Sequence, residues 1–309
     1  MNSNPYVSII VPVFNGGNPF HSCVSSLMEI AYPNHKFKVI LVNDGSTDNT
    51  GNWLYKQKLL TNFEIITHAK NNGRAAARNS GLKNVKGDII IFLDADMIVK
   101  PDFIKQHVKV LSKSEVVAAS GLLLSNPKQP RTSLQDYLFE YRRRGAKQFG
   151  ENIPIPFNYL ITGNLSVTRR AVDECGVFDE SYVGYGGEDT DYAIRLWELY
   201  PEGLRFSSKA VSIHCHDESL GDLETKIRKY GSTNYLRLLN KYPKYANSLA
   251  GDWINSIKGY LVFNPAVKWV VTTILYIFPF PYFLRYLIAY SLIIGARNPK
   301  AGVPKFHAM

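Results

Sequence analysis

The sequence predicts an α/β domain whose mostly parallel sheet is flanked by helices, followed by a helical C-terminal section. In the first 125 of the 309 residues, short apolar runs rich in β-branched residues alternate with stretches of helical periodicity. That alternation is the order expected of a parallel sheet with crossover helices. After about residue 222 the alternation stops, and the chain becomes basic and then strongly apolar.

Five apolar runs are the predicted strands, because each is short and most are bounded by turn-forming residues. They are residues 7–13, 39–42, 63–68, 89–93 and 116–124, and the helices expected around them are about 19–30, 48–60, 73–84 and 101–113. Ligands of such sheets bind beyond the carboxyl ends of the strands. The polar residues that follow these ends are therefore the first candidates for a functional site: Asn15, Asp44, Asp94 and Asp96.

The stretch from about residue 125 to 221 is less regular. Residues 133–147 predict a helix that contains three consecutive arginines, 142–144. These arginines are as compatible with a solvated helix end as with binding of a phosphate group. A further helix is expected from about Glu188 to Leu199.

Positive charge and apolar sequence coincide near the C-terminus. Residues 222–309 contain 12 Lys or Arg and 3 Asp or Glu, which gives +9 of the net charge of +10. Within them, the 16 residues from Trp269 to Leu284 carry no charge. This combination favours an anionic membrane surface over nucleic acid. The run is shorter than the roughly 20 residues of a spanning helix and contains two prolines. We therefore expect two interfacial helices or a shallow re-entrant hairpin, with packing on the protein or on a second subunit as the alternative.

The three cysteines, Cys23, Cys175 and Cys215, do not have the spacing of a disulfide framework. They indicate free thiols in a reducing compartment. The predicted strand that starts near Tyr6 makes a cleaved signal peptide improbable. Together with the basic C-terminal section, these features predict a cytoplasmic protein, peripheral on the cytosolic face of a membrane.

Two carboxylates stand two residues apart at the end of a strongly apolar strand. Residues i and i+2 of a strand point to the same face, so Asp94 and Asp96 can converge on one site. Two adjacent carboxylates repel each other unless a cation lies between them, and their hard oxygen atoms suit Mg²⁺ or Mn²⁺. The alternative is a solvated turn, which the preceding run IIIFL disfavours because it predicts a central strand.

Other polar residues have both a structural and a functional interpretation. Asp44 lies in NDGST, a string that also forms turns and helix caps. Arg74 and Arg78 are four apart and share a helix face, where a solvated pair and a phosphate- or base-binding pair are both consistent with the spacing. His214 and His216 lie two apart, so either one can supply a nitrogen ligand to an acidic metal site.

Two acidic residues open the predicted helix at residue 188, directly after two glycines. Glu188 and Asp189 are ordinary residues for a helix first turn because they favour the positive end of the helix dipole. The preceding Tyr185, Gly186 and Gly187 indicate instead a backbone that approaches a ligand closely. In that case one of the two carboxylates is a candidate general base.

Taken in this order, the strings resemble the inverting glycosyltransferases of family 2, which have the GT-A fold. The matching strings are VSIIVPVFNGG, VNDGSTDNT, NNGRAAARNSGL, DIIIFLDAD and GGEDTDYAIRLW, within residues 6–216. Residues 178–217 are also similar to the C-terminal catalytic part of animal β-1,4-galactosyltransferases, whose metal-binding histidine lies three residues before an aspartate. That spacing favours His214. Tyr stands where that family has Trp in this string, so the donor sugar is not transferred with the resemblance.

The resemblance implies a role for each candidate residue. Asp189 would be the general base. The expected donor nucleotide-binding residues are Pro12, Asn15, Asp44, Arg74 and Asp94. The expected sugar- or acceptor-binding residues are Gly163, Asn164, Gly187 and Glu188. The expected ligands of Mn²⁺ or Mg²⁺ are Asp94, Asp96 and His214.

The same resemblance implies a domain plan and partners. A catalytic domain is expected at residues 1–221, with a nucleotide-binding half at 1–125 and an acceptor half at 126–221, and a membrane-associating region at 222–309. The expected partners are a nucleotide-sugar donor, with UDP-sugars first, a glycan or polyprenyl-diphosphate-linked acceptor and a membrane surface, but not nucleic acid. The oligomeric state, a homo-oligomer included, stays open.

Three rival functions also follow from parts of the pattern. A sugar nucleotidyltransferase shares the layout, but FNGGNPF lacks the basic residue expected after the first strand. A non-catalytic nucleotide-sugar-binding protein would keep Asp44 and the metal site without needing Asp189. A dehydrogenase is disfavoured because no GxGxxG follows the first strand.

Overall fold

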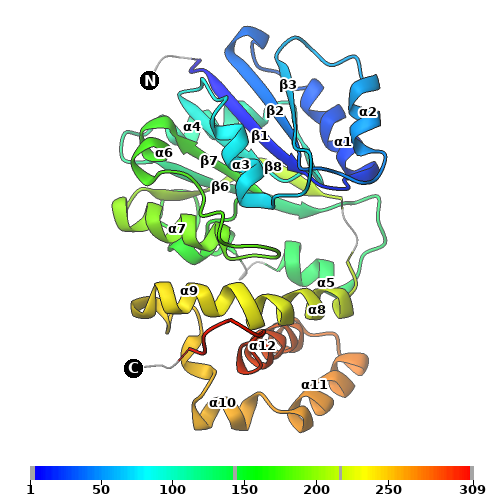
Figure 1. Cartoon of the computed structure of the whole chain (residues 1–309), viewed down its shortest axis with the longest axis vertical. Helices are drawn as coiled ribbons and strands as arrows, with labels where there is room; N and C mark the ends of the chain where they lie inside the picture. The colour runs from blue at the N-terminus through cyan, green and yellow to red at the C-terminus, as the bar shows by residue number, and fades with distance from the viewer. Residues whose placement is uncertain (1–3, 142–144, 216–217, 307–309) are drawn as a thin grey trace. The chain divides into compact units, whose positions relative to one another are not determined.

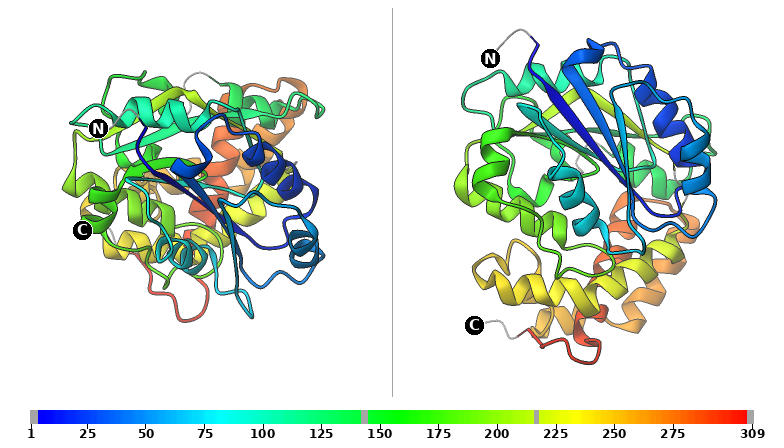
Figure 2. Two further views of the ribbon diagram at one scale, coloured as in Figure 1. Left: turned by 90° about the horizontal axis from the view of Figure 1, so that it is seen from above. Right: turned by 45° about the horizontal axis from the view of Figure 1, so that its top comes forward.

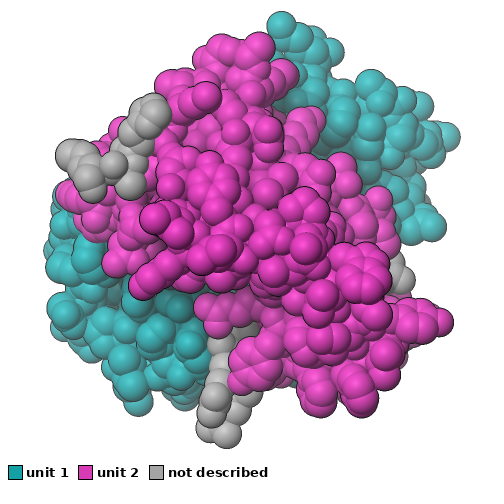
Figure 3. All heavy atoms as spheres, turned by 90° about the horizontal axis from the view of Figure 1, so that it is seen from below, with its two compact units in different colours: residues 1–126, 142–181, 188–216 teal, residues 127–141, 182–187, 217–309 magenta. Residues whose placement is uncertain are grey.

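The computed structural model describes residues 4–141, 145–215 and 218–306. Figure 1 shows the helices and strands of the chain, and Figure 3 colours the two units into which it divides. Unit 1 consists of residues 1–126, 142–181 and 188–216, and unit 2 of residues 127–141, 182–187 and 217–309. The two short inserted segments distinguish this division from the single boundary expected at residue 221. The arginines at 142–144, together with His216 and Asp217, lie outside the described residues.

Within the described residues, unit 1 contains an eight-stranded sheet with the order β3-β2-β1-β4-β7-β6-β8-β5. The strands are β1 (Val7–Val13), β2 (Phe37–Asn43), β3 (Phe63–Thr67), β4 (Ile89–Leu93), β5 (Met97–Val99), β6 (Ala118–Ser125), β7 (Asn164–Thr168) and β8 (Leu204–His214). The pairings make β5 and β7 run opposite to the other strands. The sheet is therefore mixed, with most strands parallel as predicted.

The helices of unit 1 follow the strands closely. They are α1 (Gly17–Met28), α2 (Thr50–Lys56), α3 (Arg74–Leu82), α4 (Phe103–Leu111), α6 (Arg169–Cys175) and α7 (Glu188–Leu199), with short 3-10 turns at Asn34–Lys36, Ala146–Gln148 and Phe157–Tyr159. Figure 2 shows the sheet with helices on both faces. Alternation along the strands explains this: Ile9 packs in one core with residues of α1 and α4, whereas Ile10 faces Gly81 of α3.

All five predicted strands exist, but the sequence did not reveal β5, β7 and β8. Strand β8 contains the polar string SSK at residues 207–209, opposite an irregularity of the ladder between Gly121 and Leu122. The predicted helix at 133–147 is wrong in its extent. Helix α5 (Ser133–Gln135) passes into a π-helix (Asp136–Glu140), and Tyr141 is extended where the helix was expected to continue.

Unit 2 is helical in its described part. Besides α5 and the π-helix after it, it contains α8 (Leu220–Tyr230), a π-helix (Gly231–Tyr235), α9 (Leu236–Lys241), α10 (Ile257–Val262), α11 (Pro265–Ile277) and α12 (Pro281–Arg297), with 3-10 turns at Pro243–Tyr245 and Gly251–Trp253. Its core includes buried residues of α12 and the second π-helix, among them Tyr235, Tyr290 and Ile293. Helix α11, in contrast, has no buried residue. None of the described helices combines the length and apolarity needed to cross a membrane.

Candidate active site

A buried arginine joins the tip of the central strand β4 to the start of helix α7. Arg78 of α3 donates hydrogen bonds from Nη1 to Glu188 Oε1 at 2.9 Å and from Nη2 to Asp94 Oδ1 at 3.1 Å. Its side chain is only 2% exposed, and its guanidinium group lies over the ring of Phe178. The Arg78 bridge therefore brings together two strings, DIIIFLDAD and GGEDTD, that are almost a hundred residues apart.

The positive charge of Arg78 and the negative charges of Asp94 and Glu188 stabilise one another. Burial alone lowers the pKa of the Arg78 guanidinium, but Asp94 and Glu188 outweigh that effect and raise it above its ordinary value. Glu188 is 3% exposed, so without Arg78 its negative charge would be buried and unbalanced. The sequence predicts Arg78 only as a partner of Arg74 on one helix face, either solvated or binding a phosphate or base. The signal that could have indicated its burial is the small-residue string AAA before it, which suits a helix packed closely against its surroundings.

Asp189 follows Glu188 in the first turn of α7. Burial raises its pKa most, and the charge of Glu188 raises it further, while Arg78 and Arg74 act in the opposite direction. Its Oδ1 accepts a hydrogen bond from the backbone N–H of Thr190 at 2.8 Å. A carboxylate with a raised pKa is a stronger base than an ordinary aspartate, which is the property a general base requires.

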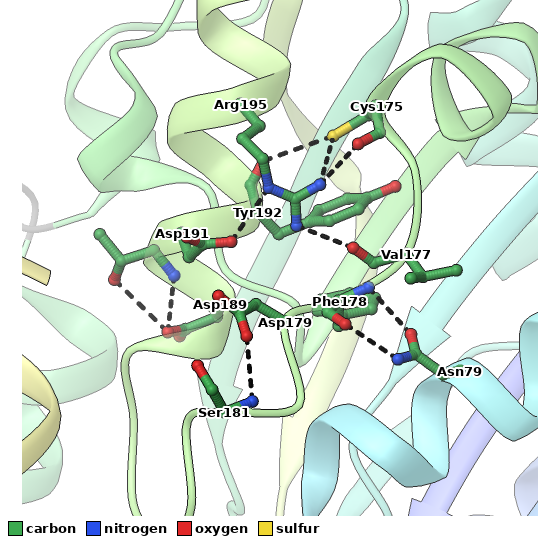
Figure 4. Close-up of polar contacts among 11 residues, drawn as sticks. Asn79, Cys175, Val177, Phe178, Asp179, Ser181, Asp189, Asp191, Tyr192 and Arg195 are labelled. Atoms are coloured by element: carbon green, nitrogen blue, oxygen red, sulfur yellow. Dashed lines mark hydrogen bonds and ion pairs between the residues drawn. The ribbon is translucent and has the colours of Figure 1, made fainter. Parts of the chain in front are cut away.

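The start of α7 is held in place by side chains that bind the loop before it (Figure 4). Arg195 of α7 donates hydrogen bonds to the backbone carbonyls of Cys175 and Val177. Asn79 of α3 binds both the N–H and the carbonyl of Phe178, each at 2.9 Å. Because Asn79 is the chain neighbour of Arg78, one helix fixes both the loop and the carboxylates. This rigid support suits a site that must hold a base in a defined position.

The second aspartate of the strand tip lies beside a histidine. Strand β5 pairs with β8 so that Met97 is opposite His214. This pairing puts His214 Nε2 3.3 Å from Asp96 Oδ2. The oxygen of Asp96 and the nitrogen of His214 are donor types that Mn²⁺ accepts, and Asp96 also suits Mg²⁺. This pair is therefore chemically suited to the predicted cation.

The predicted trio of metal ligands is not assembled. Among the described residues there is no group of three or more His, Cys, Asp or Glu side chains arranged to hold a metal ion. Asp94 is not part of such a group because its Oδ1 atom forms an ion pair with Arg78. The alternative histidine, His216, lies outside the described residues. The donor set that fits a cation is thus Asp96 with His214.

Asp44, at the end of β2, organises the loop that leads into α3. Its two carboxylate oxygens accept hydrogen bonds from the backbone N–H groups of Asn72 and Gly73 at 2.9 and 2.8 Å. His68 Nδ1 is 2.6 Å from Asp44 Oδ1. Asp44 is 3% exposed, so this loop-forming role explains its position. That Asp44 also contacts a base stays a prediction, as does the role of Arg74, which is exposed in the first turn of α3.

Asn15, at the end of β1, organises the neighbouring turn. It has a left-handed backbone with φ of 53°. Its Oδ1 accepts hydrogen bonds from the N–H groups of Thr47 and Asp48 at 2.8 and 3.2 Å. Pro12 lies in β1 itself, opposite Val42 of β2. These predicted donor-binding residues thus lie at or near the carboxyl ends of adjacent parallel strands.

Gly163 and Asn164 differ from each other in their surroundings. A Cβ atom on Gly163 would lie 2.8 Å from Asp94 Oδ2, so glycine allows the Asp94 carboxylate to occupy its position. Asn164 is fully buried, and its amide binds His107, the carbonyl of Ala210 and the hydroxyl of Ser212. Its side chain therefore ties strands together in the interior, and a contact of Asn164 with the sugar or the acceptor stays a prediction.

The glycines before α7 have a packing explanation within unit 2. Gly187 has a φ of 100°, and a Cβ there would lie 2.7 Å from the ring of Tyr182. Asn234 donates hydrogen bonds to carbonyls of the same loop, the shortest to Gly186 at 2.8 Å. Close packing on Tyr182 and Asn234 explains the glycine at 187. That Gly187 also contacts the sugar or the acceptor stays a prediction.

Two models of known protein families match this chain. The family model described as Glycosyl transferase family 2 matches residues 8–176, more than half of the chain. A second one, described as N-terminal domain of galactosyltransferase, matches residues 143–216. The second match includes the start of α7 with Asp189, and also His214. The two matches confirm the two resemblances inferred from the motifs.

Two of the relatives each match about four fifths of this chain. The uncharacterized glycosyltransferase YfnE of Bacillus subtilis (strain 168) is 26% identical over 307 residues, covering 81% of this chain and 76% of the relative. A chondroitin synthase of Pasteurella multocida (strain Pm70) is 24% identical over 278 residues, covering 79% of this chain but only 28% of the synthase.

Solved structures show the same fold. A mannosyltransferase of Pyrobaculum calidifontis, PcManGT, in complex with GDP-Man and Mn²⁺ has a TM-score of 0.65 at 18% identity and covers 96% of this chain and 88% of its own. TarS 1-349 of S. aureus in complex with UDP-GlcNAc has a TM-score of 0.55 at 16% identity, covering 95% and 90%. The fold is therefore GT-A, and this chain is a glycosyltransferase that belongs to glycosyl transferase family 2.

Proposed function

We propose that this enzyme transfers a sugar with inversion from a nucleotide-diphosphate sugar to a hydroxyl group, with Asp189 as the general base. The observation that supports the proposal is the Arg78 bridge, because it links the strand tip that carries Asp96 to the helix start that carries Asp189. Donor activation and acceptor deprotonation then occur in one cluster of unit 1. UDP-sugars are the first donors to test, since TarS binds UDP-GlcNAc, with GDP-Man second after PcManGT.

The mechanism follows from the charges. An acceptor hydroxyl is a poor nucleophile, and Asp189 removes its proton as the bond from the anomeric carbon to the diphosphate breaks. Attack from the face opposite the leaving group converts an α-linked donor into a β-linked product. Glu188, held by Arg78, is positioned next to the base and keeps its pKa raised. A divalent cation held by Asp96 and His214 would neutralise negative charge on the departing diphosphate.

A donor screen tests this proposal. Nucleotide release is measured with UDP- and GDP-sugars in the presence of Mn²⁺, Mg²⁺ or EDTA. We expect release with at least one donor, its abolition by EDTA and its recovery on addition of excess metal. The Asp96→Asn variant should need a higher metal concentration for half-maximal activity. Release that is insensitive to EDTA would contradict the role of the cation.

The proposed acceptor is a glycan or lipid-linked glycan at a membrane surface. Helix α11 has no buried residue, and Trp269 and Tyr276 are 71% and 94% exposed. Exposed Trp and Tyr side chains are typical of the headgroup region of a bilayer. The enzyme would then be peripheral, with α11 in the interface. A glycan acceptor accords with the similarity to a chondroitin synthase.

Two substitutions test the membrane proposal without removing any helix. The double variant Trp269→Ser/Tyr276→Ser should reduce flotation with anionic liposomes at least tenfold, because each aromatic side chain buries apolar area in the interface. Tyr55→Ser changes a side chain of unit 1 that is also highly exposed, and should float like the wild type. Equal flotation of the wild type, the double variant and Tyr55→Ser would show that α11 is not the element that binds the membrane.

A further inference from the structure

A cavity of about 700 Å³ lies within unit 2 and shares no residue with the candidate active site. Helices α8, α11 and α12 and the π-helix after α8 line it. Among its lining residues are the basic side chains of Arg228, Lys229 and Lys268 and one acidic side chain, Glu224. A cavity with three cations and one anion carries a net positive charge, so the chemistry of its lining favours an anionic ligand.

The acidic residue is neutralised inside the cavity wall. Glu224 Oε1 is 2.7 Å from Lys268 Nζ and accepts a hydrogen bond from the hydroxyl of Ser291 at 3.1 Å. Within the part of the chain that the structure describes, Arg228 and Lys229 have no such acidic partner, and both are exposed. These two side chains therefore supply the excess charge of the cavity.

Arg228 lies where the end of α8 and the π-helix after it pack closely against α12. A Cβ atom on Gly295 of α12 would lie 2.2 Å from the carbonyl oxygen of Arg228, and one on Gly231 would lie 2.3 Å from that of Leu292. The backbones of the two helices are thus in direct contact on both sides of the crossing. This contact fixes the backbone of Arg228 against α12, so the backbone that carries the cations of the cavity has a defined position.

The uncharged polar side chains that line the cavity already donate hydrogen bonds to backbone carbonyls within unit 2. The Thr225 hydroxyl donates to the carbonyl of Gly221, and the Asn298 amide donates to that of Ile294. The guanidinium and ammonium groups of Arg228 and Lys229 remain as donors for a ligand. Several N–H donors in a planar fork next to a compact ammonium group suit a phosphoryl group.

The exposed apolar residues of α11 directly follow a cavity-lining residue in the chain. Lys268 lines the cavity, and the next two residues of α11, Trp269 and Val270, are 71% and 45% exposed. A ligand that combines an anionic head with an apolar body matches both features at once. A membrane phospholipid has this structure, whereas a free phosphate ion matches only the cavity.

We propose that this cavity binds the phosphoryl headgroup of an anionic membrane lipid, while the exposed face of α11 enters the bilayer interface beside it. The inference rests on the proposed membrane location and deepens it, because it names the lipid group that is recognised. It assigns to Arg228 and Lys229 a role in lipid recognition rather than in sugar transfer.

The test compares full-length variants on vesicles matched in surface charge. One vesicle contains phosphatidylcholine with phosphatidic acid, and the other contains phosphatidylcholine with oleate, whose anionic group is a carboxylate. The wild type should bind the phosphatidic acid vesicle more tightly. Arg228→Gln/Lys229→Gln should lose this preference and bind that vesicle roughly tenfold or more weakly, since each basic residue at such a surface contributes about fivefold.

A matched double variant separates recognition from general attraction. Lys244→Gln/Lys258→Gln removes the same charge from exposed residues of unit 2 that do not line the cavity, and should keep the preference for phosphatidic acid. Equal losses in the two double variants, or equal binding of the wild type to both vesicles, would overturn the proposal. Calorimetric binding of inorganic phosphate without a vesicle preference would assign a free-phosphate site and overturn the lipid assignment.

Donor binding is measured in parallel to keep the two proposals distinct. UDP and GDP are titrated into the wild type and the cavity variant, and both proteins should bind nucleotide equally. A wild type that recognises phosphatidic acid but binds neither nucleotide would count against the proposed sugar transfer alone. A wild type that binds nucleotide without lipid preference would count against the cavity proposal alone.

Discussion

The Asp189→Asn variant is expected to lower turnover by about 10²–10⁴-fold, the usual range for loss of a general base. The amide cannot accept the proton of the acceptor hydroxyl, but it keeps the size of the carboxylate and can still accept the hydrogen bond from Thr190. Donor affinity should change little. Steady-state kinetics with the donor found by nucleotide release would measure turnover and KM separately.

A matched carboxylate serves as the control for this variant. Asp173 on α6 is exposed and lies four residues from Arg169, its ion-pair partner. Asp173→Asn should therefore retain near-normal turnover. If Asp189→Asn were equally active, Asp189 would not be the base.

The raised pKa of Asp189 also predicts how activity depends on pH. The base must be deprotonated, so activity should fall as pH decreases through a pKa that lies above that of an ordinary aspartate. The acidic limb of kcat/KM measures this value for the free enzyme. A limb at the pKa of an exposed aspartate would mean that burial and Glu188 do not act on the essential base.

The same pKa shift predicts a gain of stability in Asp189→Asn. Because the pKa of Asp189 is higher in the folded than in the unfolded chain, the folded protein binds more protons between the two values. The free energy of unfolding of the wild type therefore decreases as pH rises through that window and stays lower above it. The variant lacks this cost, so its Tm should exceed that of the wild type near neutral pH. The difference should shrink below the ordinary aspartate pKa.

The second large effect is expected for Arg78→Met, which leaves Glu188 buried without its cation. Breaking a buried ion pair by removing one partner costs about 3–5 kcal/mol. We expect a loss of this order in the free energy of unfolding, measured by denaturant titration, together with a large loss of turnover. Arg74→Met changes an exposed arginine on the same helix and should alter stability by about 0.5 kcal/mol or less.

A double variant separates the stability effect from the catalytic effect. Arg78→Met/Glu188→Gln removes the unbalanced buried charge, so it should recover part of the lost stability. It should not recover turnover, because Asp94 still lacks the group that holds its carboxylate. Full recovery of turnover would show that Arg78 acts only through folding and not through the position of the strand tip.

The sequence predicted those parts of the fold that depend on local pattern. The strands at residues 7–13 and 89–93 are short runs of mostly apolar residues, a pattern that is recognisable without a structure. The start of α7 at Glu188 was also predicted, because two glycines precede a helical period. In each case the signal lies within about ten residues of the feature.

The parts that escaped prediction depend on distant contacts. Arg78 and Glu188 are 110 residues apart, so no local pattern reveals that they bind each other. Strand β5 is three residues long and exists because it pairs with β8. Asn164 and Gly187 are predicted sugar- or acceptor-binding residues, and their surroundings show packing contacts that the sequence does not reveal. Helices α11 and α12 are both apolar, but only α12 has buried residues.

The most direct measurement of the central claim is the anomeric configuration of the first-formed product. Proton NMR follows an α-linked nucleotide sugar in the presence of enzyme and cation, with either an added acceptor or water receiving the sugar. A single displacement assisted by Asp189 predicts that the β anomer accumulates first, before any mutarotation of free sugar. Initial formation of the α anomer would contradict this account.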